Sequence, residues 1–278
     1  MRKIGFVALT IVAACSSGPR LPTSPQGAPV VEIRGALKAG PFALGQADLD
    51  RLPRLVVRGV DPQTSRAAVW EGTSVATLVS ERVDLRKGAD TVIIRTADRT
   101  AIPIPLTVIR QLKPVLADRA DGARLATKIL AWPTEHQQGL ATDPRAATWW
   151  ARDVVAFEIV EWQQMFAPAL ATPVGAVDAA RRGSGVYAES CISCHRLRGV
   201  GGDRGPELTT VAARIRPGVF ASLLPNHPGW HERPPADPGS EEATEIWSFL
   251  RSVAAAAAVL SEPEPITADL GGTQPNTP

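Results

Sequence analysis

The stretch "CISCHRLRGVGGDRGPEL", residues 191–208, holds two of the three cysteines and one of the four histidines of this 278-residue chain. A Cys-x-x-Cys pair can bind zinc, cycle between dithiol and disulfide, or attach a haem. A zinc ribbon usually needs a second such pair, and the sequence has none. A thioredoxin-type pair lies between a strand and a helix of a βαβ unit, and no such pattern surrounds residue 191.

The haem interpretation uses the histidine as well, because Cys-x-x-Cys-His attaches a c-type haem. Two thiols about one helical turn apart can reach the two vinyl groups of one porphyrin, and the adjoining histidine then ligates the iron. We therefore expect one covalent haem c, attached through Cys191 and Cys194, with His195 as the proximal iron ligand.

Residues 176–258 resemble a class I cytochrome c domain. The segment "RRGSGVYAESCISCH" is similar to the family's opening helix, with Gly183 at its small-residue position, and "GGDRGPEL" is similar to its Gly-Pro-x-Leu loop. The resemblance implies an all-α domain in which the Pro206 carbonyl orients the proximal histidine. It also implies that Phe249, in the closing helix, crosses the opening helix at Gly183.

The chain departs from this family at the distal iron ligand, which is usually a methionine shortly before the last helix. Met1 and Met165 are the only methionines, and both precede the haem motif. The corresponding loop, "LPNHPGWHERPP", offers two histidines instead. We expect His231 to be the distal ligand because it lies nearer the position just before "PP", with His227 as the second candidate. An open distal site is the remaining alternative and would suit a gas or redox sensor.

The first half of the chain predicts a mixed α/β domain. Short alternating runs rich in β-branched residues, bounded by Gly, Pro or Asp, indicate strands. They lie at residues 30–35, 54–60, 91–97, 102–109 and 154–162. Helices are expected near residues 46–52 and 74–80.

This half resembles the molybdopterin-binding domain of sulfite-oxidase-like enzymes, in "VEIRGALKAGPFALGQADLDRLPRLVV", "WEGTSVATLV", "DTVIIRTADRTAIPIPL" and "ATWWARDVVAFEIVEW". Those enzymes hold molybdenum partly through a cysteine thiolate, and no cysteine lies between Cys15 and Cys191. A site that needs a thiolate cannot form without one. We therefore expect a degenerate domain without a molybdenum cofactor. His136 is expected to be a loop residue, and Trp149 and Trp150 to be core or interface anchors.

The N-terminus, "MRKIGFVALTIVAAC", has the basic start and short apolar run of an export signal. Its ending resembles a bacterial lipobox, which implies that Cys15 is lipidated; the alternative is a plain signal peptide. We expect an exported protein, anchored by lipid to the inner or outer membrane and facing the periplasm.

The balanced charge, 30 basic against 28 acidic residues, argues against a nucleic-acid partner. Seven arginines nevertheless surround the haem motif in sequence. They form either a solvated basic face or a docking surface for an acidic redox partner. These residues are Arg181, Arg182, Arg196, Arg198, Arg204, Arg214 and Arg216.

The expected fold class is α+β multidomain, with the mixed α/β domain followed by an all-α cytochrome c domain. The expected function is one-electron transfer between redox proteins by a membrane-anchored carrier or complex subunit, rather than catalysis. The alternative is an oxidoreductase whose first domain binds a pterin or small substrate and passes electrons to the haem. The expected segments are a lipoprotein signal (1–14), a tether (15–29), the degenerate domain (30–166), a linker (167–175), the cytochrome c domain (176–259) and a disordered tail (260–278).

Overall fold

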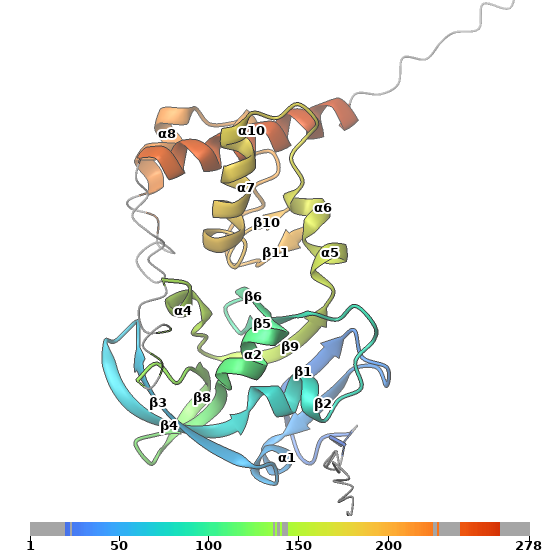
Figure 1. The fold of residues 1–278 in the computed structure, drawn as a ribbon, viewed down its shortest axis with the longest axis vertical. Helices are drawn as coiled ribbons and strands as arrows, with labels where there is room; N and C mark the ends of the chain where they lie inside the picture. The colour runs from blue at the N-terminus through green and yellow to red at the C-terminus, as the bar shows by residue number, and fades with distance from the viewer. Residues whose placement is uncertain are drawn as a thin grey trace, which may run out of the picture. The chain divides into compact units, whose positions relative to one another are not determined.

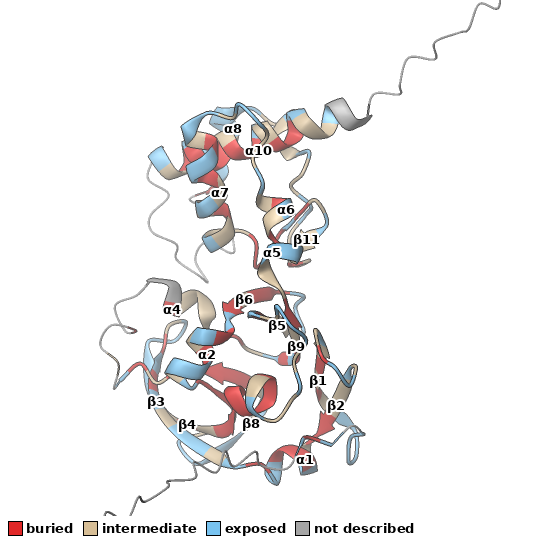
Figure 2. Cartoon of the chain, turned by 45° about the vertical axis from the view of Figure 1, so that its right-hand side comes forward, coloured by how far each residue is buried: buried red, intermediate tan, exposed pale blue. Residues whose placement is uncertain are grey.

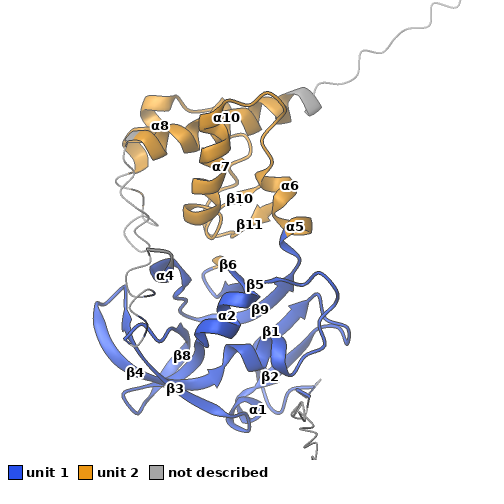
Figure 3. Ribbon diagram, viewed as in Figure 1, with its two compact units in different colours: residues 1–98, 102–162 blue, residues 99–101, 163–278 orange. Residues whose placement is uncertain are grey.

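The computed structural model describes residues 20–22, 24–135, 137, 140, 144–224, 227 and 240–261. The chain divides into two compact units (Figure 3). Unit 1 comprises residues 1–98 and 102–162, and unit 2 comprises residues 99–101 and 163–278. The expected signal sequence with Cys15, the residues His136 and His231, and nearly all of the expected tail lie outside the described residues.

Unit 1 contains two sheets (Figure 1). The first is mixed, with strand order β2-β1-β9-β5-β6, and its β1 pairs parallel with β9 and antiparallel with β2. Its strands are β1 (Pro29–Gly35), β2 (Phe42–Gly45), β5 (Thr91–Thr96), β6 (Ala101–Pro105) and β9 (Val154–Val160). The second is antiparallel and consists of β3 (Arg54–Asp61), β4 (Arg66–Ser74), β7 (Val115–Ala120) and β8 (Ala123–Ala131).

Short helical segments connect these strands. They are α1 (Gln46–Asp50), the π-helical turn η1 (Thr77–Glu81), α2 (Leu106–Leu112) and α4 (Pro144–Trp149). The expected single strand at residues 102–109 is wrong, because β6 ends at Pro105 and α2 begins at Leu106. Leu106 and Ile109 are both buried at the i, i+3 spacing of a helix face. The spacing of the buried residues therefore changes from that of a strand to that of a helix at Pro105.

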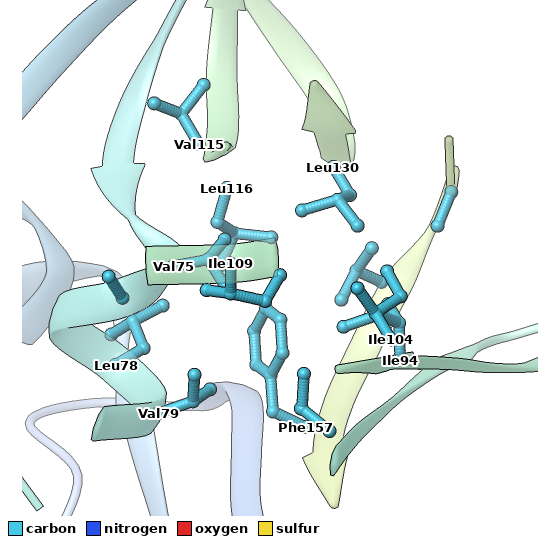
Figure 4. Packing of buried hydrophobic residues seen from close by; sticks show 14 of the residues in the cluster. Val75, Leu78, Val79, Ile94, Ile104, Ile109, Val115, Leu116, Leu130 and Phe157 are labelled. Atoms are coloured by element: carbon cyan, nitrogen blue, oxygen red, sulfur yellow. The ribbon is translucent and has the colours of Figure 1, made fainter. Parts of the chain in front are cut away.

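The core of unit 1 draws apolar side chains from both sheets and from the helical segments between them. Figure 4 shows Phe157 of β9 beside Ile109 of α2, with Leu78 of η1 and Leu116 of β7 in the same cluster. Figure 2 shows buried residues on strands and on helical segments of this unit, and exposed residues in many of the turns. Full burial of each such side chain contributes about 1.5–3 kcal/mol, so this cluster stabilises the pairing of the two sheets.

An ion-pair network crosses the four-stranded sheet. Arg54 of β3 pairs with Asp118 of β7 and, at 2.6 Å, with Glu71 of β4, while Lys128 of β8 lies 3.8 Å from Asp118. Burial raises the pKa of Asp118, but hydrogen bonding and attraction to Arg54 outweigh it, so the pKa lies below its ordinary value. The network therefore ties all four strands together through one ionised carboxylate.

Unit 2 is built around two helices and a small sheet. Its elements are α5 (Trp162–Met165, whose first residue belongs to unit 1), α6 (Ala167–Leu170), α7 (Asp178–Ser190), β10 (Arg196–Leu197), β11 (Val200–Gly201), η2 (Val211–Ala213), α8 (Pro217–Leu223) and α10 (Ser240–Ser261).

The prediction of an all-α second domain is wrong, because the chain forms mixed α/β structure with three sheets and the third sheet lies in unit 2. Directly after the Cys-x-x-Cys-His motif, β10 and β11 pair antiparallel, with Leu197 opposite Val200. The two residues between them, Arg198 and Gly199, have φ values of 50° and 79°. Positive φ at both central positions is typical of a two-residue type I′ hairpin turn, which reverses the chain in register.

Helices α7 and α10 pack closely against each other at Gly183. A Cβ at this position would overlap the backbone carbonyl of Glu245 on α10. Phe249, one turn further along α10, packs instead on Tyr187, with ring centroids 5.7 Å apart. The expected crossing of Phe249 over Gly183 is therefore wrong. Gly183 lets the backbone of α10 approach α7 closely, and the ring of Phe249 contacts the next turn of α7.

Candidate functional site

The Cys-x-x-Cys-His segment forms one tight turn at the C-terminal end of α7. The Cys191 carbonyl accepts hydrogen bonds from the backbone N–H groups of Cys194, at 3.1 Å, and His195, at 2.9 Å. This turn places both thiols and the imidazole on the lining of a single pocket in unit 2. Both cysteines are free thiols.

The ring of His195 is held in one orientation. Its Nδ1–H donates to the carbonyl oxygen of Pro206 at 2.8 Å, which leaves the lone pair of Nε2 for another partner. A Cβ on Gly205 would overlap this ring, so a glycine is required where the loop passes over it. Gly205 also donates its N–H to the Cys194 carbonyl at 2.8 Å, which holds the loop against the turn.

The pocket beside this turn is largely apolar. It encloses about 940 Å³ of space free of protein atoms, part of it open to solvent. Besides the motif residues, the lining consists of Ser190, Pro206, Leu208, Val211, Ile215, Phe220, Leu223, Leu224, His227, Ile246 and Leu250.

Burial determines the protonation of the groups at this site. Desolvation, with a smaller contribution from Cys194, raises the pKa of the Cys191 thiol. Desolvation lowers the pKa of His195, and the hydrogen bond to Pro206 opposes this only in part. The site therefore favours a protonated Cys191 thiol and a neutral His195 imidazole, and neutral imidazole is the form that ligates metals.

A second histidine enters the same pocket. The ring of His227 lies with its centroid 5.6 Å from that of His195, at an interplanar angle of 53°. Desolvation, then repulsion from His195 and Arg204, lowers the pKa of His227. Of the two candidate distal residues, the structure thus describes His227 and brings it to His195, whereas His231 lies outside the described residues.

The indole N–H of Trp247 on α10 is buried and has no hydrogen-bond partner among the residues that the structure describes. Its ring packs on Phe220 of α8, a pocket-lining residue, with centroids 5.3 Å apart. A buried N–H without an acceptor is costly and unusual. The sequence motifs did not single out this residue or the apolar positions of α8, although the spacing of Phe220, Leu223 and Leu224 marks one helix face.

Most of the arginines around the motif have partners within unit 2. Arg182 pairs with Glu245, and Arg196 pairs with Asp203 at 3.1 Å. Arg198 donates from Nη1 to three carbonyls at 2.9–3.1 Å, and so joins the β10–β11 turn to the segment around α6. Arg214 and Arg216 are exposed. The arginines therefore act partly as internal braces, and only some of them offer charge to a partner.

Unit 1 has no thiolate at the position expected in the sulfite-oxidase-like enzymes. The stretch "VVRGVDPQTSRAAVW" forms the hairpin of β3 and β4, and contains no cysteine. Trp150 is buried and packs edge-on against Trp70 at 5.4 Å, while Trp149 contacts Trp132 at 5.3 Å. Both predicted tryptophan anchors therefore contact core residues. Within the described ranges, no three or more His, Cys, Asp or Glu side chains are arranged to hold a bare metal ion.

No protein-family profile matches the sequence, and no curated protein matches it either. Among solved structures, part of the chain is weakly similar to the sulfane dehydrogenase SoxCD from Paracoccus pantotrophus, with a TM-score of 0.37 and 15% sequence identity. The matched region covers 49% of this chain and 40% of that chain, so the likeness is weak and partial. In the part of the chain that the structure describes, no helix is long and apolar enough to cross a membrane.

Proposed function

We propose that unit 2 binds one haem covalently and carries single electrons between protein partners. The observation that carries this proposal is the placement of Cys191, Cys194 and His195 on one apolar pocket, with the ring of His195 fixed by the Pro206 carbonyl. Each thiol would add across one vinyl group, so that a C–S bond forms and the thiol hydrogen moves to the other vinyl carbon. This addition needs no oxidant, because both cysteines enter it as thiols.

The residues of the pocket fit a haem in two respects. The donor set is two thiols and an imidazole nitrogen, which matches covalent attachment and axial ligation. The lining is apolar, as the porphyrin face requires.

In this function the protein supplies attachment, orientation and exclusion of water. Bound haem supplies a reversible one-electron couple at its iron. Pro206 keeps His195 in the tautomer with a free Nε2, and such hydrogen bonds fix the orientation of a metal-bound histidine. Apolar side chains of the lining, including Leu208 and Leu250, would cover part of a bound haem and reduce its contact with water.

For unit 1 we propose a docking role, as a domain related to the sulfite-oxidase-like family that has lost its metal site. The residues do not fit molybdenum, because no cysteine lies between Cys15 and Cys191. Export and lipidation at Cys15 belong to the same proposal. They would hold the carrier at a membrane on its periplasmic side, near redox proteins or a membrane electron-transfer complex.

The test is a redox titration of the purified full chain, combined with iron and molybdenum analysis. We expect one iron per chain, no molybdenum, and a single reversible one-electron transition. Molybdenum in amounts equal to iron would contradict the proposed carrier and would support an enzyme that feeds electrons to the haem.

A further inference from the structure

We infer that His227 is the second axial ligand of the iron, so that the bound haem has two histidine ligands. This inference rests on the proposed function, since it concerns the same haem. It differs from the expectation drawn from the sequence, which ranked His231 first because of its position before two prolines.

The geometry of the two rings supports this assignment. His195 and His227 line the same pocket, and their ring centroids are 5.6 Å apart. Two imidazoles on opposite sides of one metal ion, with metal–nitrogen bonds of about 2 Å, have ring centres roughly 6 Å apart. The observed separation is close to this value.

The position of His227 is also set by its backbone. Its N–H donates to the carbonyl of Leu224 at 3.0 Å, directly after α8. Helix α8 itself contributes Phe220 and Leu223 to the lining of the pocket. The histidine is therefore attached to a wall of the pocket rather than to a distant part of the loop.

The methionines compete poorly for the distal position. No methionine follows His195 in the sequence, and Met165 in α5 is not among the residues that line the pocket. A neutral imidazole is a good iron ligand, and the rings of both histidines reach the same pocket. Ligation by His227 would close the iron to small ligands, which favours an electron carrier over a gas sensor.

The inference can be tested by absorption and electron paramagnetic resonance spectroscopy of the oxidised, haem-loaded full chain. We expect a low-spin iron in the wild type. His227→Ala should become high-spin, and added imidazole should restore the low-spin spectrum. His231→Ala and His136→Ala serve as matched controls and should stay low-spin. A low-spin His227→Ala protein, or a high-spin His231→Ala protein, would overturn the assignment.

A second variant covers the case in which His227→Ala does not accumulate with haem. His227→Met should stay low-spin, gain the weak red absorption band of a methionine–iron bond, and show a higher reduction potential. A haem-loaded His227→Met protein without this band would also overturn the assignment. Loss of haem from the wild type itself would instead refute the proposed function, so the two failures are distinguishable.

Discussion

Gly183 offers the sharpest test of how unit 2 is packed. Replacing it with alanine places a Cβ on the backbone carbonyl of Glu245, which lies inside α10 and cannot turn away. Gly185 lies on the same helix and is not buried, and a Cβ added there would meet no atom within 4 Å. The two substitutions are therefore chemically identical but differ in what the new methyl group meets.

The expected magnitudes follow from this difference. In a helix, alanine is favoured over glycine by about 1 kcal/mol, so Gly185→Ala should raise the stability of unit 2 by up to that amount. Overpacking typically costs about 1–3 kcal/mol, and the upper end applies to Gly183→Ala because the obstructing atom belongs to the backbone. After the gain in helix propensity, Gly183→Ala should destabilise unit 2 by about 2 kcal/mol.

Hydrogen exchange measured by mass spectrometry on the full chain can detect this difference in peptides from α7 and α10. A gap of about 3 kcal/mol between the two variants corresponds to roughly a hundredfold difference in exchange rate, because each 1.4 kcal/mol is tenfold. Peptides from unit 1 provide an internal control and should not change. Equal protection of α7 and α10 in the two variants would refute the close approach at Gly183.

Three further predictions concern other parts of the chain. Asp118→Asn should destabilise unit 1 by about 2 kcal/mol. This is less than the cost of breaking a fully buried ion pair, because Arg54 keeps its ion pair with Glu71. The folded pKa of Asp118 is lowered, so its contribution to stability is present above its unfolded pKa and is lost as pH falls through the folded pKa. Thermal melts from pH 7 to pH 3 should therefore show that the variant loses less stability in acid than the wild type. An equal loss of stability in both proteins would contradict the ion pair. Arg198→Asn should speed hydrogen exchange in residues 167–171, because asparagine tolerates the left-handed turn but cannot reach the three carbonyls. Arg214→Asn should leave this exchange unchanged. Equal exchange in the two variants would argue against the hydrogen bonds from Arg198 to this segment. Cys15→Ala should move the protein from the membrane to the soluble exported fraction or leave its signal uncleaved, and an unchanged membrane fraction with normal cleavage would exclude the lipid anchor.

The sequence predicted the strands that have a clear composition. The runs at β1, β3, β5 and β9 are rich in β-branched residues, and the structure has strands at these positions. The run at residues 102–109 misled the prediction because the buried residues change from strand to helix spacing at Pro105. Strands β10 and β11 are two residues long, too short to show any period, although Arg198 and Gly199 occupy a turn with a recognisable type.

In the candidate site, too, the sequence predicted some residues and missed others. The spacing within Cys-x-x-Cys-His is local, so a single turn brings Cys191, Cys194 and His195 to one pocket. The order of His227 and His231 in a loop does not reveal which ring reaches His195, because that depends on how α8 packs. The unpartnered N–H of Trp247 could not be foreseen either, since it depends on the burial of one ring atom rather than on a residue pattern.

The covalent link between Cys191, Cys194 and one haem is the central claim, and intact mass spectrometry of the denatured mature chain tests it most directly. The protein would be produced in cells able to mature c-type cytochromes, beside a Cys191→Ser, Cys194→Ser double variant. We expect the wild-type chain to carry the added mass of one haem through denaturation and the double variant to carry none. A wild-type chain at the mass of the polypeptide and its lipid alone would contradict the claim.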